Sequence, residues 1–200
     1  MGARRGEVAE VLVTETQLSE RIGELGQTLA AELAETSSPP VMIGVLKGST
    51  PFLADLIRAM KIDCEVDFMA ISSYSDHLGQ SGVVRIVKDL ETDLTGRDVV
   101  IVEDIVDTGL TLTYLRRTLA SRAPGSLRAV SLLDKTVRRI VPVELDHRGF
   151  EIPDVFVIGY GLDFQGRYRN VPRILAVRDV ARLANDPLLL VDELFPSLGG

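Results

Sequence analysis

The chain has 200 residues, 46% of them apolar, and Asp and Glu (29) outnumber Lys and Arg (22). This length and composition suit one α/β domain with a buried core, which we place at residues 1–200 with loose tails at 1–5 and 197–200. The acidic balance disfavours nucleic-acid binding, and no apolar segment reaches the roughly 18 residues that cross a membrane. Because Cys64 is the single cysteine and MGARRGEVAE lacks the apolar run of a signal peptide, we expect a cytoplasmic protein without an internal disulfide.

Helix and strand patterns alternate along the first part of the chain. Apolar residues from Leu18 to Leu33 recur at helical spacing behind Thr16, the expected N-cap, and this helix should end before the SSPP breaker at residues 37–40. A strand is predicted at residues 41–46. After a tight KGST turn, PFLADLIRAM indicates a helix with Pro51 in its first turn.

A polar loop separates the next two strand patterns. CEVDFMAISS alternates like a half-buried strand, YSDHLGQSG at residues 74–82 has no periodicity, and VVRIVKDLE resumes the alternation. The pair predicts a long β-ribbon with a mobile tip.

The second half of the chain predicts a parallel sheet. VVIVEDI is a continuous apolar run suited to a strand buried on both faces, and TLTYLRRTLASRA is a helix ended by Pro124 and Gly125. Further strands fit LRAVSLLD, DVFVIGY and RILAV. Repeated strand, turn and helix indicates an α/β fold with a mostly parallel sheet, whose sites lie at the carboxyl ends of its strands.

Acidic residues surround a turn that otherwise suits phosphate. Residues 107–111 (DTGLT) lie where VVIVEDI gives way to a helix, so backbone N–H groups and two hydroxyls can converge on one phosphate. Neither GxxxxGK[ST] nor GxGxxG is present. Glu103 and Asp104 are well placed to accept hydrogen bonds from sugar hydroxyls, which predicts a phosphorylated sugar as ligand. The alternative is that these acids only cap the following helix.

The whole stretch VVIVEDIVDTGLTL resembles the phosphoribosyl pyrophosphate signature of type I phosphoribosyltransferases, and the rest of the chain is similar to the hypoxanthine-guanine branch. Four further blocks support the resemblance in the family's order: LKGS at 46–49, SSY at 72–74, LLDKTVRR at 132–139 and FVIGYGLDFQGRYRN at 156–170. The resemblance implies a mostly parallel central sheet flanked by helices, a small base-binding hood and a mobile lid loop.

The resemblance also implies a reaction. Family members transfer a 5-phosphoribosyl group from its pyrophosphate donor to a purine nitrogen and release pyrophosphate. Glu103 and Asp104 match the acids that contact the ribose, where their charge favours an oxocarbenium-like transition state. Asp107 matches the acid that accepts the purine N7 proton. The residues that match the 5′-phosphate ligands are Thr108, Gly109 and Thr111.

The pyrophosphate and its metal are assigned in the same way. Lys47 and Gly48 match a turn that follows a cis peptide bond at Leu46-Lys47 in the family, although an isolated lysine here would be read as a solvated loop residue. Arg169 matches a residue that holds pyrophosphate with forked bonds. The expected cofactor is Mg²⁺, and its matching residues are Glu103, Asp104 and, usually through water, Asp163.

On the base side, Lys135 matches the lysine that donates to the purine 6-oxo group, which selects 6-oxopurines over adenine. Phe156 matches the aromatic that stacks on the purine, and Val157 offers backbone groups to its edge; outside this context Phe156 would be read as a core residue. Ser73 and Tyr74 match the lid that excludes water.

Some residues fit the resemblance less directly. Gln165 and Gly166 replace the small and acidic residues that relatives often carry, which questions the shape of that loop. His77 and His147 have no partners at metal spacing and are expected at the surface. The pair at residues 138–139 is either a helix-end charge cluster or a pyrophosphate contact, with Arg139 the closer match.

Two other functions stay open at this point. Transcriptional regulators of the same fold bind the sugar donor without catalysing transfer, but they are expected to carry a nucleic-acid-binding module or a basic face. An enzyme that prefers xanthine or another base is the second alternative. We expect small-molecule partners, no nucleic acid, no membrane, and assembly as a homodimer or homotetramer.

Overall fold

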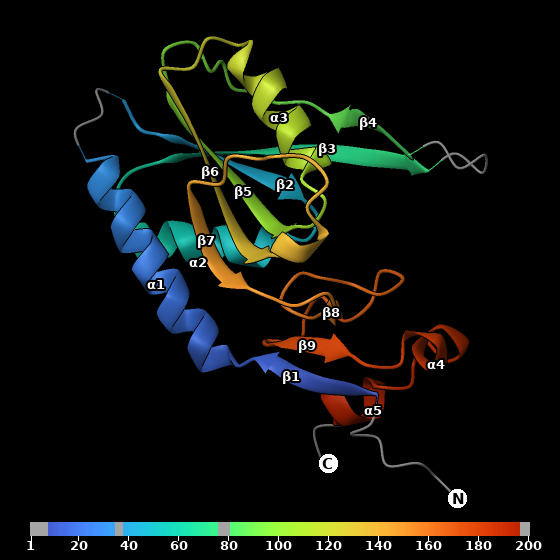
Figure 1. Cartoon of the computed structure of the whole chain (residues 1–200). Coiled ribbons are helices and arrows are strands. Elements are labelled where there is room, and N and C mark those ends of the chain that lie inside the picture. The colour runs from blue at the N-terminus through green and yellow to red at the C-terminus, as the bar shows by residue number, and fades with distance from the viewer. Residues whose placement is uncertain (1–7, 35–37, 76–80, 197–200) are drawn as a thin grey trace, which may run out of the picture. The chain divides into compact units, whose positions relative to one another are not determined.

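The computed structural model describes residues 8–34, 38–75 and 81–196, and of residues 73–75 and 81–84 it describes the backbone alone (Figure 1). The expected loose tails, the expected mobile loop tip and His77 lie outside the described residues. Contacts divide the chain into a small unit, residues 1–18 and 155–200, and a large unit, residues 19–154. No helix among the described residues is long and apolar enough to cross a membrane.

The large unit is built on a six-stranded sheet with the order β4-β3-β2-β5-β6-β7. All neighbours pair in parallel except β3 and β4, which form the antiparallel ribbon that the sequence predicts. The strands are β2 (Val41–Leu46), β3 (Glu65–Ser75), β4 (Ser81–Lys88), β5 (Asp98–Val106), β6 (Ser126–Asp134) and β7 (His147–Glu151). The helices are α1 (Glu15–Glu32), α2 (Thr50–Met60) and α3 (Leu110–Ala120), with a short 3₁₀ helix, η2, at Thr136–Arg138.

Helices cover both faces of this sheet (Figure 1). Alternate residues of β2, such as Ile43, join Leu112, Leu115 and Leu119 of α3 in one buried cluster. Gly44 points to the opposite face, where an added Cβ would lie 2.8 Å from a methyl carbon of Leu53 in α2. Burial on both faces explains why β2 and residues 99–102 of β5 are continuous apolar runs.

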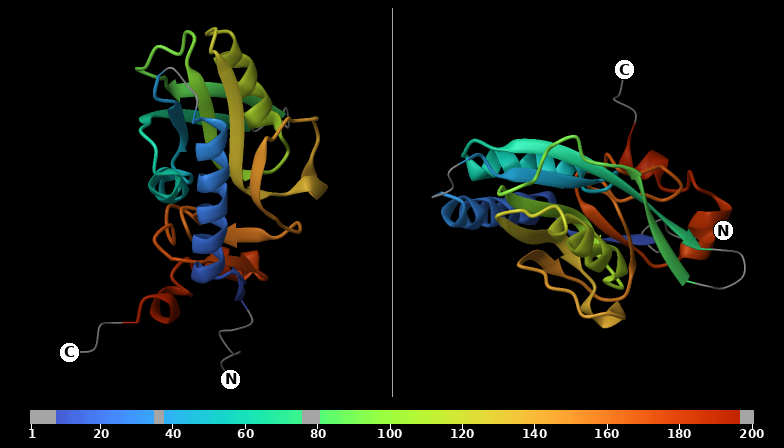
Figure 2. Two further views of the ribbon diagram at one scale, coloured as in Figure 1. Left: turned by 90° about the vertical axis from the view of Figure 1, so that its left-hand side faces the viewer. Right: turned by 90° about the horizontal axis from the view of Figure 1, so that it is seen from above.

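Helix α1 lies against α2 in the large unit, as both views of Figure 2 show. The contact is close because position 26 has no side chain: a Cβ on Gly26 would lie 2.6 Å from Cβ of Ala59. The first residue of α1 is Glu15, and its cap is Thr14, not Thr16 as the sequence analysis expected. The N–H of Gln17 donates to Thr14 Oγ1 at 3.2 Å, and the Gln17 side chain accepts from Thr14 N at 2.9 Å.

The small unit has its own antiparallel sheet, in the order β1-β9-β8. Its strands are β1 (Ala9–Val13), β8 (Phe156–Ile158) and β9 (Ile174–Val177), and two short helices follow, α4 (Val180–Asn185) and α5 (Val191–Leu194). The strand patterns DVFVIGY and RILAV thus form strands as predicted, but they pair with each other and β1 instead of extending the parallel sheet. Ile158, Tyr168 and Leu183 are among the residues of its separate core.

Candidate active site

The phosphate turn, residues 107–111, connects β5 to α3. Its Gly109 has a φ of 86° and forms the N-cap of α3, in the left-handed region that favours glycine. A Cβ at this position would also lie 3.0 Å from both Arg139 Cδ and the Val141 carbonyl oxygen. Thr111 lies in the first turn of α3. Leu110 N makes a long bond to Thr108 Oγ1 at 3.4 Å, and the other N–H groups of a helix start have no helical carbonyl partner and can bind an anion.

The acid pair, Glu103 and Asp104, lies near the carboxyl end of β5. Glu103 is only 4% exposed, and its Oε1 has no hydrogen-bond partner among the described residues. Burial, and secondly the neighbouring Asp104 carboxylate, raise the pKa of Glu103 well above its usual value. A buried carboxylate oxygen without a partner fits a site whose ligand, a hydroxyl or a cation, completes it.

The KGST turn touches this acid pair. The peptide bond between Leu46 and Lys47 is cis, as the resemblance implies. Gly48 is buried, and a Cβ built on it would lie 1.6 Å from Asp104 Oδ2, so the backbone passes directly against the carboxylate. The Lys47 side chain is exposed, while its carbonyl accepts from Thr50 Oγ1 at 2.8 Å. The turn after β2 therefore meets the carboxyl end of the neighbouring parallel strand β5.

Asp107 is held by an arginine that the sequence analysis did not connect to it. Arg138 Nε lies 3.0 Å from Asp107 Oδ1, a distance that makes an ion pair although the geometry is not that of a hydrogen bond. The same guanidinium reaches Asp154 through Nη1 at 3.3 Å. Arg138 thus lies between two carboxylates, and the Asp107 side chain stays 42% exposed.

Lys135 follows β6 directly and is 7% exposed. Its N–H donates to the Val106 carbonyl at 2.9 Å, which anchors its backbone beside the end of β5. Among the described residues, its ammonium has no ion pair or hydrogen bond. Because most of the Lys135 side chain is buried while its ammonium has no partner among the described residues, this ammonium is suited to a ligand acceptor.

In the small unit, Phe156 is 38% exposed and is not a core residue. Its ring meets that of Phe164 edge to face, with centroids 5.9 Å apart. Val157 is buried, and β8 lies at the edge of its sheet, so one side of this strand has no strand partner among the described residues.

Asp163 and Arg169 form an ion pair in the small unit, with Arg169 Nη2 2.5 Å from Asp163 Oδ1. Asp163 Oδ2 accepts from Gly166 N at 2.7 Å. Gln165 and Gly166 have φ angles of 50° and 82°, the pattern of a type I′ turn, and Phe164 and Arg167 exchange backbone hydrogen bonds around them. The unusual Gln-Gly pair therefore forms a regular tight turn beside Asp163.

Other predicted residues are placed without direct tests of their roles. The backbones of Ser73 and Tyr74 pair with Val84 and Val83 near the end of the β3-β4 ribbon. His147 is half-buried and bonds to Glu32 at 3.1 Å. Among residues 8–34, 38–75 and 81–196 there is no cluster of three or more His, Cys, Asp or Glu that could hold a metal by itself.

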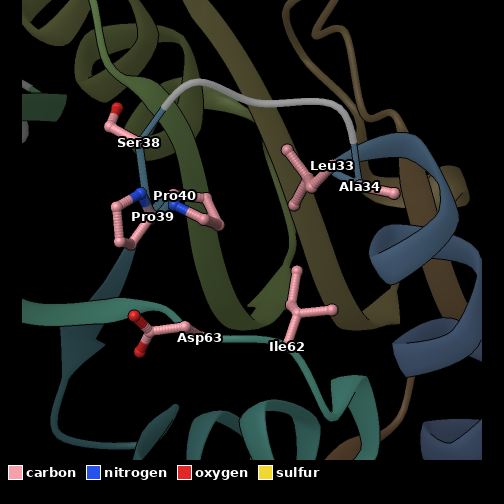
Figure 3. Close-up of a pocket in the computed structure, with 7 residues that line it drawn as sticks. All are labelled: Leu33, Ala34, Ser38, Pro39, Pro40, Ile62 and Asp63. Atoms are coloured by element: carbon pink, nitrogen blue, oxygen red, sulfur yellow. The ribbon is translucent and has the colours of Figure 1, made fainter.

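A separate hollow of about 300 Å³ opens in the large unit (Figure 3). It is lined by Leu33, Ala34, Ser38, Pro39, Pro40, Ile62 and Asp63. Pro39 and Pro40 precede β2, so this hollow lies at the amino ends of the parallel strands, whereas the phosphate turn follows the carboxyl end of β5. It is therefore not part of the candidate active site.

Residues 15–165 match the family model described as a phosphoribosyl transferase domain, and the chain belongs to this family. Within it, the chain is 46% identical over 168 residues to the hypoxanthine-guanine phosphoribosyltransferase of Bacillus subtilis, which covers 84% of this chain and 92% of that protein. It is 47% identical over 173 residues to the hypoxanthine-guanine phosphoribosyltransferase of Mycobacterium tuberculosis, and this match covers 84% of this chain and 86% of that protein. A crystal structure of the Staphylococcus aureus hypoxanthine phosphoribosyltransferase matches with a TM-score of 0.81 at 40% identity, covering 88% of this chain and 94% of that one.

Proposed function

We propose that the acid pair and the phosphate turn bind 5-phosphoribosyl 1-pyrophosphate for transfer to a 6-oxopurine. The reaction is hypoxanthine-guanine phosphoribosyl transfer in purine salvage, which yields IMP or GMP and pyrophosphate. One observation carries the assignment of the site. The buried Glu103 has an oxygen without a partner among the described residues, and it lies near the end of β5, just before the glycine turn that leads into α3. Sugar hydroxyls and a 5′-phosphate are the groups that these two features recognise.

The ribose lies against the acid pair in this proposal. Glu103 and Asp104 accept hydrogen bonds from the ribose hydroxyls, and their negative charge stabilises the positive charge that develops on the sugar as its bond to pyrophosphate breaks. Thr108, Gly109 and Thr111 hold the 5′-phosphate and so fix the distance between the reacting carbon and the base.

Four residues recognise the purine in this proposal. Lys135 donates to the 6-oxo group, Phe156 stacks on the ring, and Val157 offers backbone groups to the base edge. Asp107 takes the proton from N7 as the new bond forms. The ammonium of Lys135, which has no partner within the described part of the chain, and the exposed ring of Phe156 support these roles.

The pyrophosphate is held by Lys47, Gly48 and Arg169 in this proposal. Mg²⁺ would be held by Glu103, Asp104 and Asp163, and it would neutralise part of the charge of the donor. The unpartnered oxygen of Glu103 fits such a cation, and the engagement of both Asp163 oxygens within the small unit fits a contact through water.

Closure and assembly complete the proposal. Ser73 and Tyr74 close over the substrates and exclude water, since hydrolysis of the donor competes with transfer.

The protein works as a homodimer or homotetramer, and a monomer in sedimentation at micromolar concentration would contradict this. The free Cys64 supports a reducing, cytoplasmic setting.

Steady-state kinetics with hypoxanthine, guanine and xanthine, and with adenine as control, test the proposal. We expect turnover of hypoxanthine or guanine and none of adenine, because a 6-amino group cannot accept the hydrogen bond from Lys135. A preference for xanthine would change the assigned base. Tight binding of the sugar donor without turnover of any base would instead indicate a regulator.

A further inference from the structure

The segment of residues 135–141 packs along the phosphate turn and bonds to three successive carbonyl groups. The bonds run from Lys135 N to Val106 O (2.9 Å), from Arg139 Nη1 to Asp107 O (3.1 Å), and from Ile140 N and Val141 N to Thr108 O (3.0 and 3.3 Å). A carbonyl that is held by this segment cannot turn its negative oxygen toward a bound phosphate. The segment therefore keeps the turn in the arrangement that leaves its N–H groups to the anion.

Arg139 is the one side chain of the described residues that bonds to the Asp107 carbonyl. Its other terminal nitrogen, Nη2, donates to Asp134, which is 3% exposed at the end of β6. Arg148 lies 3.4 Å from the second oxygen of the same carboxylate. The guanidinium of Arg139 is thus fixed by a buried acid on one side and supports the turn on the other.

Close packing adds to these bonds. The Arg139 side chain packs closely against position 109, where a Cβ would lie 3.0 Å from its Cδ. Both terminal nitrogens of Arg139 are engaged within the large unit. A pyrophosphate contact, which the resemblance favours for Arg139, would require the side chain to leave Asp134 and the turn.

We propose that Arg139 is a positioning residue for the 5′-phosphate, acting through the Asp107 carbonyl, and not a ligand of pyrophosphate. This inference rests on the proposed function, because the turn must be the 5′-phosphate site. Arg169, which we assign to pyrophosphate, is also engaged at both terminal nitrogens, by the Gly161 carbonyl at 2.6 Å and by Asp163. The distinction between the two arginines therefore rests on the bond of Arg139 to the Asp107 carbonyl in the phosphate turn.

Arg139→Lys tests the inference because lysine keeps the positive charge beside Asp134 but has only one terminal nitrogen, so it cannot also hold the Asp107 carbonyl. The dissociation constants of IMP, ribose 5-phosphate and Mg²⁺-pyrophosphate are measured by calorimetry. We expect those of IMP and ribose 5-phosphate to rise about tenfold, the size of one lost charged hydrogen bond, and that of pyrophosphate to stay within about twofold. A rise for pyrophosphate alone, or equal changes for all three ligands, would overturn the inference.

Two further arginine variants serve as controls. Arg169→Lys should show the reverse pattern, with weaker pyrophosphate binding and nearly unchanged binding of ribose 5-phosphate. Arg58→Lys, at an exposed side chain of α2 paired with Asp55, should change none of the three constants. These variants separate an effect on the turn from a general effect of replacing arginine.

Asp134→Asn removes the anchor without touching the turn, and it carries the test if Arg139→Lys folds poorly. We expect the same selective loss of 5′-phosphate binding, because the asparagine no longer holds the guanidinium as firmly. Unchanged binding of all three ligands would contradict the route through Arg139. If the unmodified protein binds neither IMP nor ribose 5-phosphate, the proposed function fails. If the unmodified protein binds them but Arg139→Lys weakens all three ligands equally, only this inference is overturned.

Discussion

Side-chain size at position 48 limits where the Asp104 carboxylate can lie. An added Cβ on Gly48 would be 1.6 Å from Asp104 Oδ2, far inside the distance at which two atoms can rest. Either the carboxylate or the turn must then move. Position 48 thus couples the KGST turn to the acid pair by contact alone.

Gly48→Ala is therefore expected to lower kcat/KM by about 10²-fold, because groups that hold the transition state lose activity when displaced by an ångström. Steady-state kinetics with varied sugar donor measure this. Gly23→Ala is the matched control: nothing lies within 4 Å of its added Cβ in α1, so activity should be unchanged and the helix more stable by about 1 kcal/mol. Normal activity of Gly48→Ala would mean that the position of the Asp104 carboxylate is unimportant.

The site residues differ in how far sequence alone could predict them. The acid pair and the DTGLT turn are local patterns, and the structure places them together as predicted. The bonds of Arg138 to Asp107 and Asp154 link residues that are 31 and 16 positions apart, and only the packing of the loop after β6 creates them. The support of the turn by Arg139 is hidden for the same reason.

At the scale of elements, the buried strands and the β3-β4 ribbon were predictable, and the edge strands β1 and β7 were not. β2 and residues 99–102 of β5 are apolar runs, so the place of both strands in the chain is evident from composition. β7 (HRGFE) is a short, polar edge strand, and β1 pairs only with β9, so neither has a pattern strong enough to predict. The predicted N-cap of α1, Thr16, is wrong because Thr14 and Gln17 bond to each other reciprocally and so cap the helix two residues earlier.

Asp67 joins β3 to the loop that leads into β5. Its carboxylate accepts from the N–H groups of Phe68 (2.6 Å), Glu91 (2.8 Å) and Thr92 (3.0 Å). Burial opposes ionisation, but the hydrogen bonds from Thr92, Phe68 and Glu91 together lower the pKa of Asp67 below its usual 3.8. An acid with a lowered pKa stabilises the fold above its unfolded-state pKa and loses this effect as the pH falls.

Asp67→Asn should reduce the free energy of unfolding by about 1–3 kcal/mol near neutral pH, because it weakens a buried, charged hydrogen-bond acceptor. The difference from the unmodified protein should shrink as the pH falls below about 4, because the carboxyl of the unfolded chain is protonated there while the native carboxyl, with its lowered pKa, is protonated only at still lower pH. Urea unfolding at several pH values measures both. A difference that grows toward acid pH would show that ionisation of Asp67 does not stabilise the loop.

At the scale of the whole molecule, a protein of net charge −7 acts on a polyanionic donor. The acids Glu103, Asp104 and Asp163 would repel that donor unless a cation stood between them. We therefore expect turnover to stop in excess chelator and to return with added Mg²⁺. Calorimetry should show a parallel loss of donor affinity, and full turnover in chelator would exclude the proposed metal role.

The most direct test of the proposed chemistry is Asp107→Asn, measured by single-turnover rates alongside donor binding. Asparagine keeps the size of the side chain but cannot take the N7 proton, so the rate of transfer should fall about 10² to 10⁴-fold. The dissociation constant of the sugar donor should change little, because the turn and the metal still hold it. Nearly normal rate and binding would assign Asp107 to capping the helix, and a collapse of donor affinity together with the rate would show that it shapes the phosphate turn instead of acting as the base.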